Sequence, residues 1–569
     1  MTGDRRELMR RIDQALGGAR ADLVIKDTRF LNVATGEIAE GDIAICGDRI
    51  VGTYDSYDGE REIDGRGLTV VPGFIDTHVH CESTCVTPFE FDRCVLPRGT
   101  TTAICDPHEI CNVLGERGLT YFLESAGRMA LDLRVQLSSC VPATDLETSG
   151  ARLEADDLVR YRDHPHVLGL AEFMNFPGVF AKLPAVLDKL AAFQDRHIDG
   201  HAPLVRGREL NAYLSCGVRN CHETTSADEA WEKLRKGMQV LIRDGSVSKD
   251  VHALAGVIGP ETSPFLGFCT DDRNPLDIAE EGHMDHLIRA AIKLGAPVAH
   301  VYRAATWSAA RGFGLFDRGL VAPGQRADLV LLDDLEDCAV NTVIKGGAVV
   351  SAETFAGRGP VDPVGLDSVR LDPVRVEDFR VPEGPSARPV IGVLPGKIIT
   401  ERLTLEVPQR RGEAVADPDR DILKVCVFAR HGSNRNVGRG FVRGFGFAEG
   451  AIASSVGHDS HNVCVVGASD ADMAIAVNRL IELQGGFVAV RNGHVIGEIA
   501  LPLAGLMSLN PFETVERELK DLRASVRAMG CPLAEPFLQL AFLPLPVIPH
   551  LKITDMGLVD VDRFELVDA

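Results

Sequence analysis

Residues 69–80, TVVPGFIDTHVH, decide the fold of this chain. The segment is a short apolar strand that ends in His78 and His80. Alternate residues of a strand project from the same face, so the two imidazoles point the same way. Neutral imidazoles suit a divalent first-row metal, although an H-x-H pair alone is a weak indication of a site. Further ligand residues elsewhere in the chain are needed to indicate a metal site.

Seven further apolar runs follow, and each ends in polar or ionisable residues. In order they are 100–109, 134–144, 167–175, 197–203, 219–225, 238–250 and 265–275. Helix-patterned segments such as PAVLDKLAAFQDR lie between them. Eight strands alternating with helices over about 240 residues predict a (β/α)8 barrel, which typically has about 250 residues. Active sites of such barrels lie at the C-terminal ends of the strands, where these polar residues fall.

Imidazole and carboxylate side chains occupy several of these strand ends. They are Glu172 on the fourth strand, His201 on the fifth, His222 on the sixth and the Asp271–Asp272 pair on the eighth. The C-terminal ends of barrel strands surround one mouth, so we expect these side chains to converge with His78 and His80. The combined set predicts a metal site.

Strand-rich segments lie on both sides of the predicted barrel. Short apolar segments separated by Gly and Asp turns are typical of β-strands, and ADLVLLDD after the barrel resembles ADLVIKD before it. We therefore predict an α/β protein with a TIM-like barrel, a small β-sandwich domain built from both flanking segments, and an additional C-terminal α/β domain. The predicted bounds are 1–72 and 311–378 for the small domain, 73–310 for the catalytic barrel, and 379–569 for the C-terminal domain.

Charge and hydropathy exclude some classes of partner. The net charge of −22 would repel a polyanion, so we expect no nucleic acid. No run of 18 uncharged apolar residues is present, so no membrane span is expected. The first 18 residues are charged and helical in pattern and lack the apolar core of a signal peptide. These features predict a cytoplasmic protein.

The fourteen cysteines are expected to be reduced and mostly buried. The pairs Cys81/Cys85, Cys105/Cys111 and Cys216/Cys221 lack the tight CxxC spacing of structural zinc sites. We predict a structural role for them.

Residues 22–350 resemble the amidohydrolase superfamily. The resemblance rests on PGFIDTHVH, the acidic residue of the fourth strand, the histidines of the fifth and sixth, the aspartate of the eighth, and GLFDRGLVAPGQRADLV. The match is closer to the adenine deaminase family. It rests on VLPRGTTTAICDPHEICNVLG, LAEFMN, DGHAP, RDGSVSKD, FCTDDRNP and, in the last domain, SSVGHDSHNVCVVG. It covers nearly the whole chain, including a C-terminal domain that most superfamily members lack.

This resemblance implies a binuclear metal centre with two divalent ions per subunit. The family favours Mn2+ or Fe2+, with Zn2+ as the alternative for this mixture of nitrogen and oxygen ligands. Glu172 takes the bridging place that a modified lysine has in many relatives. The implied ligands are His78, His80, Glu172, His201, His222 and Asp271.

The implied reaction is hydrolytic deamination of adenine to hypoxanthine and ammonia, a step of purine salvage. A metal-bridged hydroxide would attack C6, and Asp271 would act as general base and then as acid. Glu109, in DPHEI at the end of the second strand, is the candidate acid for a ring nitrogen, supported by His108. Substrate contacts are expected from Asp106, Ser246, His458, Asp459 and His461. For GHDSHN the alternative is an ordinary polar turn before a strand.

Other functions are less consistent with the sequence. Zinc nucleotide deaminases carry H-x-E and P-C-x-x-C, and neither motif occurs here at a usable spacing. A cyclic amidase or an N-acyl amino acid hydrolase of the same superfamily stays the alternative. A non-catalytic scaffold is the remote alternative, because such a protein would be expected to lose metal ligands. The resemblance also implies a homo-oligomer, a dimer or a tetramer.

Overall fold

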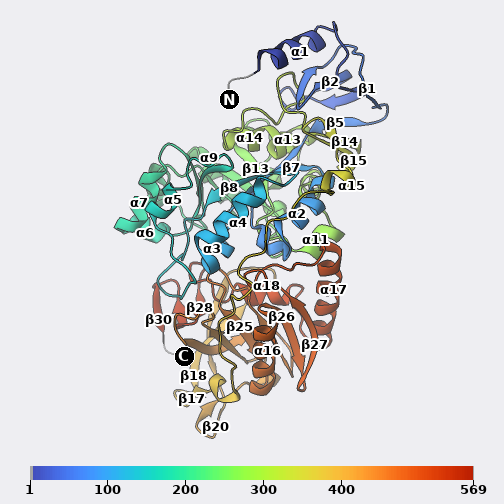
Figure 1. Ribbon diagram of the computed structural model, residues 1–569. Helices are drawn as coiled ribbons and strands as arrows, with labels where there is room; N and C mark the ends of the chain where they lie inside the picture. Colours follow the sequence, from blue (N-terminus) through green and yellow to red (C-terminus); the bar gives the residue numbers. More distant parts are fainter. Residues whose placement is uncertain (1–3, 568–569) are drawn as a thin grey trace.

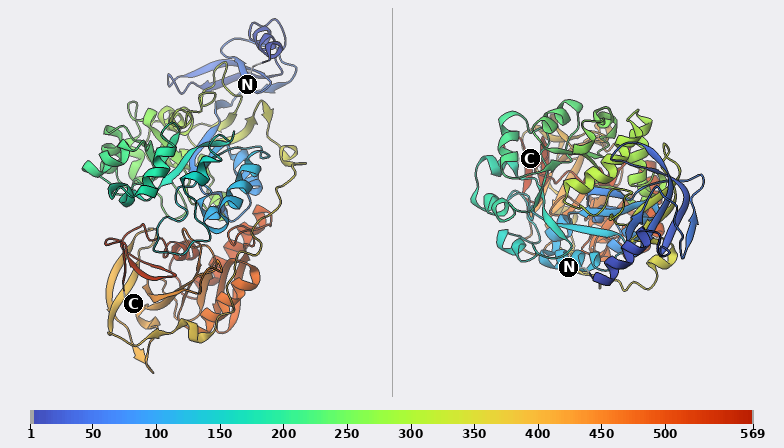
Figure 2. Two further views of the ribbon diagram at one scale, coloured as in Figure 1. Left: turned by 60° about the vertical axis from the view of Figure 1, so that its left-hand side comes forward. Right: turned by 90° about the horizontal axis from the view of Figure 1, so that it is seen from above.

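The structure, a computed structural model that describes residues 4–567, consists of three parts arranged one after another (Figure 1). A small sheet lies at one end, the barrel in the middle and the C-terminal domain at the other end. Figure 2 shows the same order from another side. The barrel therefore has a neighbour at each of its two ends.

Eight parallel strands form the barrel, as predicted. They are β6 Phe74–Val79, β7 Thr100–Cys105, β8 Asp132–Leu137, β9 Val167–Phe173, β10 His197–Gly200, β11 Asn220–Cys221, β12 Gln239–Arg243 and β13 Leu266–Cys269. Strands β6 to β10 form one ladder and β11 to β13 another. A parallel bridge between Val79 and Asp271 joins the ends of β6 and β13. Opposite it, the Arg219 N–H donates to the Ile198 carbonyl at 3.0 Å.

Helices follow the strands around this barrel. They are α2 Pro88–Val95, α3 His108–Leu114, α4 Glu116–Ala126, α5 Ala155–Val159, α6 Phe176–Phe180, α7 Pro184–Ala192, α8 Gly207–Ser215, α9 Ala227–Arg235, α10 Val251–Leu254, α11 Pro275–Glu280, α12 Met284–Lys293, α13 Val298–Arg303 and α14 Ala309–Gly312. The strand residues between them are buried without exception in β6, β7, β12 and β13. Such continuous burial is expected where a helix layer covers a parallel sheet.

The stretch 69–80 contains two strands rather than one. β5, Thr69–Pro72, belongs to the small sheet, and β6 belongs to the barrel. Gly73 separates them, and a Cβ at this position would lie 2.2 Å from the Thr101 hydroxyl oxygen. Only glycine lets the chain pass this close to β7, so one short segment connects two sheets.

The small sheet combines segments from both sides of the barrel, as predicted. Its strands are β1 Leu23–Leu31, β2 Ile38–Cys46, β3 Arg49–Gly52, β4 Glu62–Asp64, β5, β14 Leu329–Asp334, β15 Ala339–Lys345 and β16 Ala348–Val349. Their order is β16-β15-β14-β5-β1-β2-β3, and β4 also pairs with β1. The N-terminal helix α1, Arg5–Ala15, confirms the helical pattern of this segment.

An eight-stranded, mostly antiparallel sheet forms the centre of the C-terminal domain, in the order β19-β18-β23-β22-β25-β24-β26-β27. These strands are β18 Ala387–Val393, β19 Thr400–Glu406, β22 Leu423–Phe428, β23 Val437–Arg443, β24 Ala451–Ser454, β25 Val463–Gly467, β26 Gly486–Arg491 and β27 His494–Ala500. Smaller sheets contain β17 Val381–Pro382, β20 Gln409–Arg410 and β21 Glu413–Ala414, and β28 Leu551–Thr554, β29 Gly557–Asp560 and β30 Glu565–Val567. The helices are α16 Asp470–Leu483, α17 Phe512–Ala528 and α18 Pro536–Ala541.

The segment between the small sheet and this domain starts with α15, Ala352–Phe355. Farther on, Val369, Val374 and Phe379 pack into the same apolar cluster as the buried residues of α16. The chain thus joins the core of the C-terminal domain before residue 379. The domain boundaries themselves stay a prediction.

All fourteen cysteines are among the described residues, and each is a free thiol. Most are buried, as the sequence predicted. Of the helices within residues 4–567, none has both the length and the apolar character required to cross a membrane.

The loop after β8 binds the C-terminal domain through buried polar groups. The Thr148 N–H donates to Asp555 Oδ1 at 2.8 Å, and the Asn462 side-chain amide donates to the Thr148 carbonyl at 2.9 Å. Glu147 lies in this loop and is almost fully buried. Burial, together with the negative charges of Asp459 and Asp555, raises the pKa of Glu147 to about 8.

Replacing Glu147 with Gln is expected to raise the melting temperature most at alkaline pH. The folded pKa lies above the unfolded value of 4.5, so the protonated carboxyl is the stabilised form. Its contribution to stability is present below pH 4.5 and is lost as the pH rises through about 8. Melting temperatures of both proteins, measured from about pH 5 to about pH 9, test this. An offset that does not change with pH would contradict it.

Candidate active site

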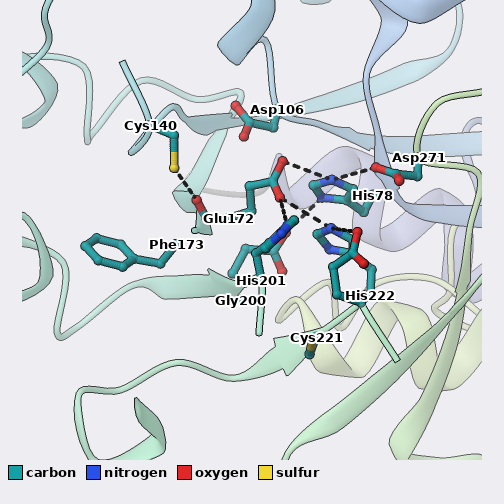
Figure 3. A network of polar contacts seen from close by, with 12 residues as sticks. His78, Asp106, Cys140, Glu172, Phe173, Gly200, His201, Cys221, His222 and Asp271 are labelled. Atoms are coloured by element: carbon teal, nitrogen blue, oxygen red, sulfur yellow. Dashed lines mark hydrogen bonds and ion pairs between the residues drawn. The ribbon is translucent and has the colours of Figure 1, made fainter. Parts of the chain in front are cut away.

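Glu172 lies at the centre of the predicted ligands (Figure 3). Its Oε2 is 2.7 Å from His201 Nδ1 and 3.3 Å from His222 Nε2. Its Oε1 is 3.6 Å from His78 Nε2 and 3.3 Å from His80 Nε2. One carboxylate is thus shared by two pairs of histidines, and all of these side chains are buried.

Asp271 completes this group from the end of β13. Its Oδ1 is 3.4 Å from His78 Nε2 and 3.3 Å from His80 Nε2. The Asp271 N–H donates to the His78 carbonyl at 3.0 Å, and the His80 N–H donates to the Asp271 carbonyl at 3.2 Å. The backbone therefore holds Asp271 directly beside the pair that opens the barrel. The structure brings together all six predicted metal ligands.

Neighbouring acceptors determine which nitrogen of each first-strand histidine carries hydrogen. His78 Nδ1 lies 3.1 Å from Asp199 Oδ2, and His80 Nδ1 lies 3.0 Å from the Asp106 carbonyl oxygen. Each Nδ1 therefore donates, and each Nε2 is the nitrogen that is left to bind either a proton or a metal ion. The two Nε2 atoms face each other at 3.1 Å. Converging lone pairs repel one another, whereas a shared cation would satisfy both, so this arrangement fits a metal ion.

The second pair of histidines fits a metal as well. His201 Nδ1 and His222 Nε2 both face Glu172 Oε2, so these are the nitrogens that would bind an ion shared with this carboxylate. Three groups each bring their ligand atoms within 4.8 Å of one another: His78–His80–Glu172, Glu172–His201–His222 and His78–His222–Asp271. Glu172 is common to two of these groups. Imidazole and carboxylate ligands in this number suit Mn, Fe(II) or Zn.

The two carboxylates at the centre of the site, Glu172 and Asp271, are ionised. Burial alone would raise the pKa of Glu172, but hydrogen bonds from the surrounding histidines hold it well below its usual value. Burial also acts to raise the pKa of Asp271, and His78, His80 and Arg243 outweigh this effect and keep it well below normal. The carboxylates in turn raise the pKa values of His78 and His80 far above normal, against the effect of burial. The site therefore attracts positive charge.

A buried arginine fixes the second oxygen of Asp271. Arg243 Nη1 donates to Asp271 Oδ2 at 2.9 Å, and the guanidinium also binds Glu223 and Asp250. Arg243 is only 2% exposed. Since Oδ2 is held by Arg243, Oδ1 is the oxygen of Asp271 that faces the histidines.

His108 lies beside Glu172 at the end of the second strand. Its Nδ1 is 3.0 Å from Asp106 Oδ2 and 3.2 Å from Glu172 Oε1. The other oxygen of Asp106 accepts a hydrogen bond from the Ser138 hydroxyl at 2.8 Å. Both oxygens of Asp106 thus have partners, and its residue is absent from the lining of the cavity. Its contacts orient His108; substrate binding by Asp106 stays a prediction.

Glu109 lies one residue farther along and is almost completely buried. Burial, reinforced by Glu82 and Asp272, raises the pKa of Glu109 well above its usual value. Its Oε1 accepts a hydrogen bond from the Ser83 hydroxyl at 3.2 Å and lies 3.4 Å from His458 Nδ1. Burial thus favours the protonated form of this carboxyl group, which contacts His458 of the C-terminal domain.

The GHDSHN loop of the C-terminal domain reaches the barrel mouth. His458 and Asp459 line the cavity, and Asp459 Oδ1 is 3.7 Å from His108 Nε2. His461 is fully buried and does not line it; its Nδ1 accepts from the Gly457 N–H at 3.2 Å. The Arg430 guanidinium donates to the carbonyl of the same His461. In this loop the first two predicted residues reach the site and the third stabilises the loop.

Ser246 contacts Asn274 and is not part of the cavity lining. Its hydroxyl oxygen accepts hydrogen bonds from Asn274, at 3.0 Å from the backbone nitrogen and 2.7 Å from the side-chain nitrogen. Ser248, two residues later, lines the cavity instead. Substrate binding by Ser246 stays a prediction.

The cavity between these groups has a volume of about 30 Å³. Its lining comprises His80, His108, Glu172, Met174, His201, His222, Glu223, Arg243, Ser248, Asp271, Asp272, Ile398, His458, Asp459, Phe542 and Leu545. The barrel supplies most of the polar groups, and the C-terminal domain covers them. Ligand sites usually have volumes of about 300–1,000 Å³. The much smaller volume here means that the barrel mouth and the C-terminal domain lie close together.

Sequence reasoning missed three kinds of residue. Asp199 is two positions before His201 on β10, and this spacing alone could have indicated it. Arg243 ends β12 as the other polar residues end their strands, but a lone arginine does not indicate which carboxylate it contacts. Ile398, Phe542 and Leu545 have no signal, because they resemble ordinary core residues.

Replacing Asp199 with Asn is expected to reduce metal affinity and kcat by about 10–100-fold. The amide could present its nitrogen to His78 Nδ1 and favour the wrong tautomer, which would put the hydrogen on the nitrogen that faces His80. Metal content after dialysis and steady-state rates measure the effect. Unchanged values for both would show that Asp199 does not orient His78.

Comparison with known proteins relates this geometry to a family. The Amidohydrolase family matches residues 69–350, and the Adenine deaminase C-terminal domain matches residues 397–565. An adenine deaminase of Cereibacter sphaeroides is 61% identical over 563 residues, which cover 99% of this chain and 100% of that protein. The chain belongs to the adenine deaminase family. The resemblance noted in the sequence is confirmed.

A second relative agrees with this assignment. An adenine deaminase of Gluconobacter oxydans is 61% identical over 561 residues, covering 98% of this chain and 99% of that protein. Among solved structures, an N-acetyl-D-glucosamine-6-phosphate deacetylase from Mycobacterium smegmatis has a TM-score of 0.44 and 18% identity, and it covers 58% of this chain and 100% of that chain. Members of the adenine deaminase family thus match the chain over almost its full length.

Proposed function

We propose that this protein catalyses the hydrolytic deamination of adenine to hypoxanthine and ammonia. The observation that carries the proposal is a site built from two parts of the chain. The barrel supplies the set of ligands around Glu172. His458 and Asp459 cover this set, and they belong to the region that matches the Adenine deaminase C-terminal domain. The names of relatives that are 61% identical over nearly the whole chain support the same substrate.

The proposal includes two divalent metal ions, Mn2+ or Fe2+ with Zn2+ as the alternative. His78 and His80 would hold one ion and His201 and His222 the other, with Glu172 shared and Asp271 completing the set. Bound there, the ions would supply the positive charge that lowers the pKa of the attacking water. The facing Nε2 atoms of the first pair support this assignment, as do His201 Nδ1 and His222 Nε2, which both face Glu172.

Asp271 is proposed to move the proton during hydrolysis. Its carboxylate is ionised, and Arg243 binds one oxygen while the other faces the reaction centre. Oδ1 would accept a proton from the attacking water and deliver it to the departing ammonia. General acid–base catalysis of this kind contributes about 10²–10⁴-fold in rate.

Protonation of the purine ring is proposed to involve Glu109 together with His458. A protonated Glu109 can donate toward His458 Nδ1, 3.4 Å away, which leaves Nε2 of this imidazole as a donor. His458 Nε2 is buried without a partner, and its residue lines the cavity. We propose that it donates to the ring nitrogen next to C6 while His108 and Asp459 hold the ring.

The finer predictions of a role in purine salvage, a cytoplasmic location and a dimer or tetramer remain proposals. The absence of nucleic acid and of a membrane among its partners has the same status. The metal-loaded protein offers the direct test of the main proposal.

The test measures the ammonia and hypoxanthine that Mn-loaded protein forms from adenine. The number of metal ions per chain is measured on the same sample. Equal amounts of both products and about two metals per chain are expected. Loaded protein that releases no ammonia would contradict adenine deamination and would direct the search to cyclic amides. Fewer than one metal per chain in an active sample would contradict the binuclear site.

A further inference from the structure

The catalytic cavity is closed around its polar groups. Its volume of about 30 Å³ is too small for any purine base, so substrate entry requires part of the lining to move. Lifting the whole C-terminal domain would break the buried hydrogen bonds of Thr148. It would also divide an apolar cluster that contains both Phe91 of the barrel and Phe537 of that domain. A local opening beside the cavity breaks far fewer contacts.

A second cavity, of about 330 Å³, lies on the other side of β9. Successive side chains at the end of this strand alternate between the two spaces, as they do along any strand. Glu172 and Met174 line the catalytic cavity, whereas Phe173 and Asn175 line the larger one. The end of one strand therefore separates the two cavities.

The larger cavity has the size and lining of a small-molecule site. Leu183 and Phe564 line it and are 47% and 41% exposed, so it reaches the surface. Its volume lies within the usual range for ligand sites, and most of its lining is apolar or aromatic. Asn175 Oδ1 accepts from the Gly178 N–H at 2.9 Å, which leaves the side-chain nitrogen as a donor. Such a lining suits a flat heterocycle whose ring nitrogens accept hydrogen bonds.

Hydrogen bonds fix the backbone between the two cavities. The Ser139 hydroxyl donates to the Glu172 carbonyl at 2.5 Å. The Cys140 thiol donates to the same oxygen at 3.2 Å (Figure 3). Lys189, which is 8% exposed, donates to the Ser139 carbonyl at 2.9 Å. These contacts hold the loop after β8 against the strand, so an opening has to come from a side chain rather than from the strand.

Met174 is an unbranched side chain at this boundary. It belongs to the apolar cluster that contains Cys140 and Ala143, which line the larger cavity, and Phe542 and Leu545, which line the catalytic one. The rotatable bonds of methionine let it change shape while its neighbours stay in place. Met174 can therefore turn out of the path between the two cavities.

We propose that the larger cavity is a vestibule for the purine base, through which adenine reaches the metal ligands, and that the Met174 side chain is the gate between the two cavities. This inference rests on the proposed function. Adenine would bind first among the apolar groups and Asn175, and it would then pass Met174 to the ligands around Glu172. Hypoxanthine would leave by the same route.

Plugging the vestibule from the surface tests the route. Ala185 lines the larger cavity and is exposed at the start of α7, so Ala185→Trp fills the space without replacing a core residue. The value of kcat/KM for adenine cannot exceed the rate of entry. We expect it to fall at least about tenfold, within the one to three decades over which association rates vary among variants of one interface. Metal content and melting temperature should stay at wild-type values.

Ala191→Trp is the matched control, because Ala191 is exposed on the same helix but does not line the cavity. It should react with adenine like the wild type. The gate is tested by Met174→Ile, which keeps an apolar side chain but adds β-branching that stiffens it. We expect a lower kcat/KM in this variant, whereas Met174→Leu, which is not β-branched, should retain more of the wild-type value.

Each part of the proposal has an outcome that contradicts it. A wild-type kcat/KM in Ala185→Trp would overturn the vestibule, and so would an equal fall in Ala191→Trp. Equal values for Met174→Ile and Met174→Leu would overturn the role of Met174 as the gate. A wild type that does not deaminate adenine at all would instead overturn the proposed function.

Discussion

Replacement of Glu172 by Gln is expected to reduce kcat/KM for adenine by more than about 100-fold. Loss of an outer contact to a metal ligand typically costs about 10–100-fold, and Glu172 lies inside the ligand set itself. The amide has no charge to balance the histidines, and its nitrogen would face an imidazole that now needs an acceptor. Metal content per chain should fall together with activity, as measured by elemental analysis and ammonia release.

Glu147→Gln is the matched control for this variant. Glu147 is also buried, but its pKa of about 8 means that it is largely neutral at pH 7, so the amide is a close substitute there. Activity near the wild-type value and full metal content are expected. If the Glu172 variant bound metal and reacted like the control, Glu172 could not be the shared ligand.

Asp271→Asn is expected to have the second large effect, a fall in kcat of about 10²–10⁴-fold with a smaller change in KM. An amide cannot accept the proton of the attacking water, although it can still fill the space beside His78 and His80. Steady-state kinetics with adenine give the two constants. If the variant keeps its metal, the lower kcat reflects the missing proton acceptor. If its metal content falls, the variant has lost a metal ligand.

A carboxylate on the other side of Arg243 serves as the control. Asp250 lies 3.2 Å from the Arg243 Nε but is not part of the cavity lining. Asp250→Asn should reduce kcat by less than about tenfold, because it removes only a remote contact. Similar losses in both variants would indicate that the arginine network, and not Asp271 itself, limits the reaction.

The ligand set was predictable because barrel topology dictates where strand ends meet. Glu172, His201 and His222 follow apolar runs in the sequence, and parallel strands bring such positions to one mouth whatever their separation in the chain. The division of the first predicted strand into two strands was harder to predict from the sequence. Gly73 divides it between two sheets, and this depends on the approach of Thr101 from another strand.

Residues whose role depends on contacts with distant parts of the chain were not predicted. Asp199 and Arg243 are charged groups in buried strands, and their partners are distant in sequence. Leu545 is one of many buried leucines, and only its place above the ligands distinguishes it. The choice between Ser246 and Ser248 depends on the path of one loop, which hydrophobic periodicity does not record.

The buried contacts among Thr148, Asn462 and Asp555 also bear on how this enzyme family can be recombined. A chimera that takes its barrel from one relative and its last domain from another must reproduce both sides of these contacts. A mismatch there would leave amide and carboxylate groups without partners at the GHDSHN loop, which costs far more than a surface mismatch. The two regions are therefore expected to be exchangeable only as a co-adapted pair.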